Sequence, residues 1–204
     1  KDFEYEISSK GNKTKYYTTS ISITDNKEMA ICYVRDITKD KEYIEELKLL
    51  SYTDQLTSLY NRKFMEERLL KLSSETHYTI SIISADLDGL KIVNDTLGHQ
   101  AGDELLKLFA DIMKSTQVNN ECLFRIGGDE FLIISPQTDE TSTKKIIKDI
   151  EDKIKKYNQS PRSLLKISVS IGAATTYISN ISLQTLLARA DREMYAIKNA
   201  KKSQ

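Results

Sequence analysis

Four acidic side chains lie at two points of the sequence where β structure is predicted to end or turn. Asp86 and Asp88 follow an apolar-rich run, and Asp129 and Glu130 follow a Gly-Gly pair between two short runs typical of strands. If these runs form neighbouring strands, the carboxylates gather at one site and repel each other unless a cation is present. Mg²⁺ typically takes one or two carboxylates together with substrate phosphates. The pattern therefore favours metal-assisted phosphoryl or nucleotidyl transfer.

Residues suited to a polyphosphate accompany these acids. Gly127 and Gly128 lack side chains and let backbone amides approach a phosphate closely. Lys91, Lys198 and Lys202 could neutralise the charge of a polyphosphate. Each feature alone favours a plainer explanation, because strand-end acids are usually solvated, a Gly-Gly pair is usually only a turn, and terminal lysines complement a helix dipole. Only their co-occurrence favours a nucleotide site.

From Ser51 onward the elements that must position these residues alternate between helix and strand. Apolar residues spaced three and four apart predict helices, and alternating or continuous apolar runs predict strands. We expect helices at 61–72, 98–116, 141–157 and 183–198 and strands at 79–85, 122–126, 130–134 and 164–174. The strands around the Gly-Gly pair form a hairpin. This predicts an α+β fold of β-α-α-β-β-α-β order, with helices covering one side of the sheet.

Residues 1–38 are predicted to be β structure throughout. Phe3, Tyr5 and Ile7 alternate with acids, and two further strands are predicted at 17–23 and 29–37. Turns are expected at 11–12 and 25–26. Three antiparallel strands of this size cannot bury both faces alone, so we interpret them as the end of a larger domain.

A helical stripe of Tyr43, Leu47 and Leu50 marks residues 39–52. The stripe could pack on the neighbouring domain or pair with a second chain as a short coiled coil. Because a coiled coil needs three or more heptads, the two alternatives are about equally favoured.

Composition restricts the partners. Lys plus Arg (30) balance Asp plus Glu (30), which argues against nucleic acid or a membrane face held by bulk charge. No apolar run approaches the ~20 residues that span a bilayer, and there is no signal peptide. Cys32 and Cys122 lack metal-ligand spacing, so we expect two buried free thiols. We expect a soluble, cytoplasmic fragment of a longer protein, without membrane contact of its own, whatever anchor lies upstream of Lys1.

Several segments resemble the GGDEF family of diguanylate cyclases, in the order and spacing of that family from about Ser51 to Lys202. The stretch 125–131 contains the signature Gly-Gly-Asp-Glu-Phe unchanged. The other resembling segments are the opening motif at 54–62, the metal and guanine segment at 86–103, the late strand at 168–173 and the closing helix at 190–198. The resemblance implies a sheet like that of nucleotidyl cyclases and polymerase palms, flanked by helices. Residues 35–38, leading into a charged helix, resemble the end of a PAS sensor domain.

The resemblance also implies a role for each site residue. Two Mg²⁺ (or Mn²⁺) ions per active site would be coordinated by Asp86, the backbone carbonyl of Leu87 and Asp129. Asp129 and Glu130 would be catalytic: Asp129 favours deprotonation of the ribose 3′-hydroxyl, and Glu130 supports the metal pair or a neighbouring contact. The implied substrate-binding residues are Asn94 and Asp103 for the guanine edge, Lys91, Lys198 and Lys202 for the β- and γ-phosphates, and in addition His99, Gly127 and Gly128.

The implied reaction condenses two GTP into cyclic di-GMP and two pyrophosphates. It needs two domains face to face, so we expect a homodimer and an inactive monomer. Two alternatives stay open: a catalytically weak module that binds GTP or cyclic di-GMP without turnover, and a piece that only dimerises. The intact set of Asp86, Asp129, Glu130, Asn94 and Asp103 favours catalysis over both.

The sequence departs from the family pattern at several places. Gln55 and Ser58 stand where Pro and Gly are usual, outside the metal site. Residues 201–202 are Lys-Lys where Gly-Arg is common, which keeps charge but loses bidentate phosphate geometry. Many members carry an Arg-x-x-Asp pair before the signature, which binds product and inhibits the enzyme. Val118 and Glu121 occupy those positions, so we expect this product-inhibition site to be absent.

Overall fold

The computed structural model describes residues 2–8, 13–23, 30–73, 78–116, 123–161, 163–177 and 181–203. The chain divides into two compact units, Lys1–Ser51 and Tyr52–Gln204. Among the helices described, none combines the length and the apolar character needed to cross a membrane.

The N-terminal unit contains a three-stranded antiparallel sheet of order β1-β2-β3. Its strands are β1 (Asp2–Ile7), β2 (Lys15–Ile23) and β3 (Ala30–Asp36). The alternating patterns predicted these strands to within a few residues. The two turns predicted at 11–12 and 25–26 lie outside the described residues.

Exposed apolar side chains lie on both faces of this sheet. The register sets Tyr5 opposite Tyr17 and Ile21 opposite Cys32, and directly opposed side chains point to the same face. Every residue of β3 is exposed, including Cys32. The expectation of a buried thiol at Cys32 is therefore wrong, because its apolar strand lies in an uncovered sheet. Cys122 lies outside the described residues.

The helix α1 (Thr38–Tyr52) completes this unit. Its start is tied to the sheet, since the Tyr16 amide donates to the Thr38 hydroxyl at 3.0 Å. The predicted stripe of Tyr43, Leu47 and Leu50 is exposed, and no residue of the helix is buried. Packing on the neighbouring domain and pairing with a second chain both stay predictions.

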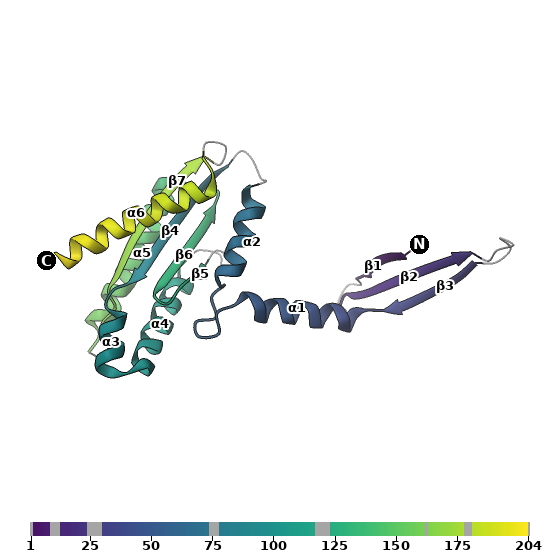
Figure 1. Cartoon of the computed structure of the whole chain (residues 1–204), viewed down its shortest axis with the longest axis horizontal. Helices are drawn as coiled ribbons and strands as arrows, with labels where there is room; N and C mark the ends of the chain where they lie inside the picture. Colours follow the sequence, from purple (N-terminus) through teal and green to yellow (C-terminus); the bar gives the residue numbers. More distant parts are fainter. Residues whose placement is uncertain are drawn as a thin grey trace. The chain divides into compact units, whose positions relative to one another are not determined.

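The second unit is a four-stranded antiparallel sheet of order β5-β6-β4-β7 with helices packed against it (Figure 1). Its strands are β4 (Thr79–Leu87), β5 (Leu123–Arg125), β6 (Glu130–Pro136) and β7 (Val169–Tyr177). Its helices are α2 (Arg62–Ser73), α3 (Leu90–Leu97), α4 (His99–Lys114), α5 (Glu140–Gln159) and α6 (Leu183–Lys202). The order from β4 to β7 confirms the predicted α+β fold.

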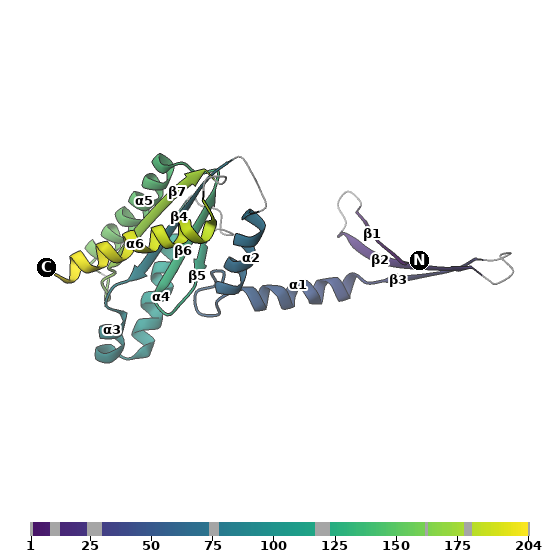
Figure 2. The ribbon, with the colours of Figure 1, turned by 45° about the horizontal axis from the view of Figure 1, so that its top comes forward.

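Two apolar layers cover the sheet, one on each face. Ile80 and Ile82 of β4 pack with α2 and α6, whereas Ile83 and Leu87 pack with α4 and α5. Figures 1 and 2 show α6 crossing one face while α5 lies on the other. The expectation of helices on one side only is wrong, because β4 is apolar on both faces and is buried from Ile80 to its end.

Three elements differ from the predicted ranges in ways that bear on the site. α3 had no range of its own, and it is set off by two glycines in the left-handed region, Gly89 (φ 76°) and Gly98 (φ 86°). α6 continues to Lys202, beyond the predicted end at Lys198. β7 begins at Val169, later than predicted, because the preceding segment is held by Asn158, whose side chain bonds the backbone of Ile167.

Candidate active site

The two groups of acids predicted from the sequence lie together at one end of the central strands. Asp86, near the end of β4, stands opposite Glu130 of β6 and Ser170 of β7. The Leu87 amide donates to the Asp129 carbonyl at 3.0 Å, which fixes the hairpin tip beside β4. The strand order therefore produces the juxtaposition that the chemistry requires.

Asp86 is a buried carboxylate with an excess of negative charge around it. Its exposed fraction is 3%, and Lys198 of α6 donates to its Oδ1 at 2.5 Å. Burial raises the pKa of Asp86, and the neighbouring Asp129 and Asp88 raise it further, while the bond from Lys198 acts in the opposite direction. Burial alone would lower the pKa of Lys198, but the bond to Asp86 and the negative charges of Asp86, Asp129 and Asp88 together outweigh it and raise that pKa. Such a site favours a cation.

Asp88 has a different environment from Asp86. Its carboxylate accepts from Ser168 at 2.7 Å, from Ser170 at 2.8 Å and from Lys201 at 2.9 Å. Burial raises the pKa of Asp88, but these three hydrogen bonds outweigh it and hold the pKa below its usual range. The charge of Asp88 is thus already matched inside the protein.

The hairpin that carries Asp129 is held by charged side chains bound to its backbone. Arg125 donates to the Gly128 carbonyl at 2.8 Å and forms an ion pair with Asp54 at 3.0 Å. Arg62 of α2 donates to the Ile126 carbonyl at 3.2 Å. These bonds come from the opening motif, α2 and β5, so three segments support the turn.

Asp54 is itself fixed by a local turn. The amide and the hydroxyl of Thr57 donate to its Oδ1 at 2.9 and 2.6 Å. Burial raises the pKa of Asp54, but the bonds from Thr57 and Arg125 outweigh it and lower that pKa. The resemblance identified the opening motif at 54–62 but implied no role for it. In the structure, Asp54 of this motif holds the Arg125 side chain in place.

The two glycines of the tip differ in their surroundings. A Cβ on Gly127 would lie 2.5 Å from Oε2 of Glu130, whereas Gly128 is exposed with open space around it. Gly127 therefore leaves room for the Glu130 side chain.

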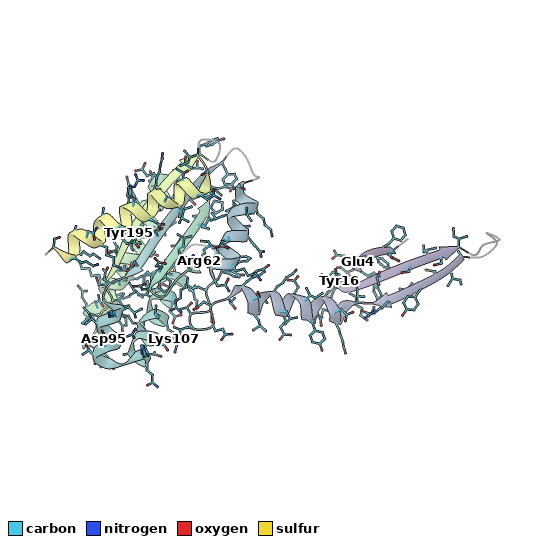
Figure 3. The ribbon with its side chains drawn as sticks, in the orientation of Figure 1. Glu4, Tyr16, Arg62, Asp95, Lys107 and Tyr195 are labelled. Atoms are coloured by element: carbon cyan, nitrogen blue, oxygen red, sulfur yellow. The ribbon has the colours of Figure 1, made fainter. Side chains whose placement is uncertain are left out.

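Glu130 faces a cavity on the α2 and α6 side of the sheet. The cavity has a volume of about 480 Å³, and its walls include Arg62 of α2 and Tyr195 of α6, both labelled in Figure 3. Asp191 also lines it and accepts from Ser84 at 2.6 Å. Glu130 thus stands directly opposite Asp86 in the sheet and lines this cavity, whereas Asp86 does not line it.

The residues implied for guanine lie on the α3–α4 segment that follows β4. Asn94 is half-buried, and its Oδ1 is buried without a hydrogen-bond partner among the described residues. A Cβ on Gly102 would stand 1.9 Å from this oxygen. The sequence analysis gave Gly102 no role. Because it lacks a Cβ, Gly102 leaves room for the Asn94 side chain. Asp103 is exposed.

The cationic residues of the predicted site are distributed unevenly. Lys198 lies at the acids, whereas Lys91 and His99 are exposed on α3 and α4. Lys202 is exposed, and its neighbour Lys201 makes the contact with Asp88. The sequence analysis gave Lys201 no role, because the resemblance implied the phosphate contact for Lys202 instead. Val118 and Glu121 lie outside the described residues, so the absence of a product-inhibition site stays a prediction.

The oxygen ligands at this site fit a magnesium ion that completes its coordination shell with substrate phosphates. Within the described residues no group of three or more His, Cys, Asp or Glu side chains could hold a metal alone. Asp86, Asp129 and the Leu87 carbonyl offer only oxygen, and Mg²⁺ takes one or two carboxylates and completes its shell with phosphates and water.

The family model for the diguanylate cyclase GGDEF domain matches residues 51–204. The diguanylate cyclase DgcM of Escherichia coli K12 is 31% identical over 188 residues, covering 90% of this chain and 44% of DgcM. The signaling protein YkoW of Bacillus subtilis is 33% identical over 192 residues, covering 91% of this chain and 24% of YkoW. The chain thus spans less than half the length of these curated relatives.

Solved structures agree with this match. The coiled coil and GGDEF domain of DgcB from Caulobacter crescentus, in complex with c-di-GMP, has a TM-score of 0.72 at 27% identity, covering 80% of this chain and 89% of that one. The diguanylate cyclase SiaD from Pseudomonas aeruginosa, in complex with its activator SiaC, has a TM-score of 0.68 at 28% identity, covering 79% and 64%. From its sequence and its fold, the chain belongs to the GGDEF family.

Proposed function

We propose that this chain is a diguanylate cyclase that condenses two GTP into cyclic di-GMP and two pyrophosphates. The proposal rests on one observation: the buried carboxylate of Asp86 lies beside the hairpin that carries Asp129, and Lys198 of α6 bonds that carboxylate. Relatives that share about a third of its residues bear the name diguanylate cyclase, DgcM among them. Cyclic di-GMP is bound by the similar DgcB domain.

The chemistry is an in-line displacement at each α-phosphate. The ribose 3′-oxygen of one GTP forms a bond to the α-phosphorus of the other, the bond between the α-phosphorus and the bridging oxygen breaks, and pyrophosphate leaves. Two Mg²⁺ or Mn²⁺ ions, held by Asp86, Asp129 and the Leu87 carbonyl, would supply positive charge that lowers the pKa of the hydroxyl. Asp129 favours loss of the hydroxyl proton, and Glu130 supports the hairpin end of the site.

Lysines and the α3–α4 segment bind the nucleotide in this proposal. Lys198 leaves Asp86 for the β- and γ-phosphates, joined by Lys91 and Lys202, and the backbone at Gly127 and Gly128 approaches the phosphates. The Oδ1 of Asn94, which lacks a partner among the described residues, accepts an N–H of guanine. Asp103 accepts from the same edge, and His99 lies four residues before it, on the same face of α4. A buried acceptor that gains a donor discriminates against bases lacking one.

Each domain holds one GTP, so turnover needs a homodimer. We assign residues 53–204 to the cyclase domain, 39–52 to a linker helix and 1–38 to the end of a PAS-like sensor, all in a cytoplasmic location. The sensor assignment is supported by three antiparallel strands that run directly into α1.

The test is incubation of the full chain with GTP and Mg²⁺, followed by mass identification of the product. We expect cyclic di-GMP from the parent and none from Asp86→Asn. Asp152→Asn, an exposed acid on α5, is the matched control and should retain turnover. GTP binding without any product from the parent would instead support a binding module and refute the cyclase.

A further inference from the structure

Three segments of the second unit meet at the carboxylate of Asp88. Asp88 follows β4, Ser168 and Ser170 lie at the start of β7, and Lys201 lies in the last turn of α6. The carboxylate receives one bond from each of these three side chains, at 2.7, 2.8 and 2.9 Å. In addition, the Asp88 amide donates to the Ser168 carbonyl at 2.9 Å. The carboxylate of Asp88 is therefore held by three side chains within the protein.

Lys201 ties the end of α6 to two of these segments. Its Nζ bonds the Val169 carbonyl at 2.6 Å as well as Asp88. Val169 belongs to β7, at the edge of the sheet. The last turn of a helix has free carbonyls and tends to fray, so a charged anchor there fixes its position.

Lys198, which reaches Asp86, lies immediately before the anchored last turn of α6. Lys198 and Lys201 are three residues apart, so they lie on the same face of α6. One bonds Asp86 and the other bonds Asp88, two acids separated by one residue. Loss of the Lys201 contact would therefore free the turn that directly follows Lys198.

We propose that Asp88 and Lys201 form a positioning pair that fixes the last turn of α6 and thereby sets where Lys198 meets Asp86. Lys201 touches neither substrate nor metal in this role and acts through Lys198. The proposal rests on the proposed function only for its nucleotide-binding readout. Its structural part concerns the ligand-free protein.

The first measurement is amide hydrogen exchange of residues 199–203 in the ligand-free full chain. Lys201→Met should speed exchange there by about five-fold, because an exposed charged contact is lost. Lys201→Arg keeps the charge and should restore protection. Lys155→Met removes an exposed lysine from α5 and should leave these amides unchanged. Equal exchange in Lys201→Met and the parent overturns the pair.

The second measurement is a double-mutant cycle on binding of an α,β-methylene analogue of GTP in Mg²⁺. Lys201→Met should weaken binding by about five-fold in the parent and less than about two-fold in the Lys198→Met background. An equal loss in both backgrounds would mean that Lys201 contacts the nucleotide itself, which overturns a role through Lys198. If the parent binds no analogue, the proposed function fails, and hydrogen exchange alone decides on the pair.

Discussion

At the scale of residues, a tightly constrained position of the site is the contact between Gly102 and Asn94. Glycine in a helix interior normally lowers stability relative to alanine by about 1 kcal/mol, so Gly→Ala is usually favourable. Here the added Cβ would stand 1.9 Å from the Oδ1 of Asn94. The helix has given up intrinsic stability at this point, which is typical of a position where a side chain must be accommodated.

We predict that Gly102→Ala destabilises the protein by about 1–3 kcal/mol through overpacking. In the Asn94→Ala background the clash is gone, and the same change should be neutral or stabilising. Urea unfolding of the four proteins measures both effects. If Gly102→Ala has the same effect with and without the Asn94 side chain, the steric account is wrong.

Base choice is also decided at single residues. The Oδ1 of Asn94, without a described partner, and the carboxylate of Asp103 can accept only from donors, and the guanine edge offers an N1–H and an amine. Adenine has no matching pair of donors, so it would leave the buried oxygen of Asn94 unsatisfied. We predict a product that contains guanine only when ATP and GTP are supplied in equal amounts. Mass analysis that finds a substantial mixed dinucleotide would refute this.

At the scale of elements, the signature hairpin depends on the opening motif. Asp54 orients Arg125, and Arg125 holds the Gly128 carbonyl beside Asp129. An ion pair at this place links the stability of the hairpin to the ionisation of Asp54. Because the folded-state pKa of Asp54 is lowered, its contribution is present above the unfolded pKa and is lost as the pH falls through the folded pKa.

We therefore predict that Asp54→Asn reduces stability at pH 7 and flattens its acid dependence. The parent should lose the Asp54 contribution between about pH 5 and the lowered pKa, whereas the variant has none to lose. Chemical unfolding at pH 7 and pH 3 measures the difference. An unchanged loss of stability in Asp54→Asn over this range would show that the ion pair contributes nothing.

Local patterns predicted the elements well where one rule applied at a time. The alternation in β1 and the apolar run of β4 identified strands, and the Gly-Gly pair marked the hairpin. The short helix α3 was not predicted, because it consists of only eight residues between two glycines with positive φ. The true end of α6 was not predicted either, because its last turn is polar and is held by the contact of Lys201 with Asp88, which is distant in sequence.

The same limits apply to the site. The acids of β4 and the hairpin could be paired from strand order, since neighbouring strands share an edge. The contacts that Lys201, Gly102 and Asp54 make could not be predicted in this way. Each depends on which residues, distant in sequence, the fold brings close together. Cys32 was predicted buried from its apolar strand, and it is exposed because the face of that sheet is uncovered.

At the scale of the whole molecule, the two units are joined through α1, which has no Gly or Pro. A helix without such residues transmits rotation rather than acting as a loose tether. If the stripe of Tyr43, Leu47 and Leu50 pairs two chains, its phase sets how two cyclase domains face each other.

We predict that inserting four residues after Lys48 changes cyclase activity more than inserting seven. Four residues rotate the downstream part by roughly 40° beyond one full turn, whereas seven nearly restore the phase at 3.6 residues per turn. Activities of the parent and both variants, measured at one protein concentration, test this. Equal activity in all three would mean that the helix is passive.

The measurement that tests the central claim most directly is the rate of pyrophosphate release from GTP by Asp129→Ala. A carboxylate at a hairpin tip contributes little to the core, so the variant should unfold at the same urea concentration as the parent. We predict that its rate falls by a factor of about 100 or more, as expected for a group acting on the reacting hydroxyl. Asp152→Ala should keep the parent rate. A folded Asp129→Ala that releases pyrophosphate as fast as the parent would contradict the account.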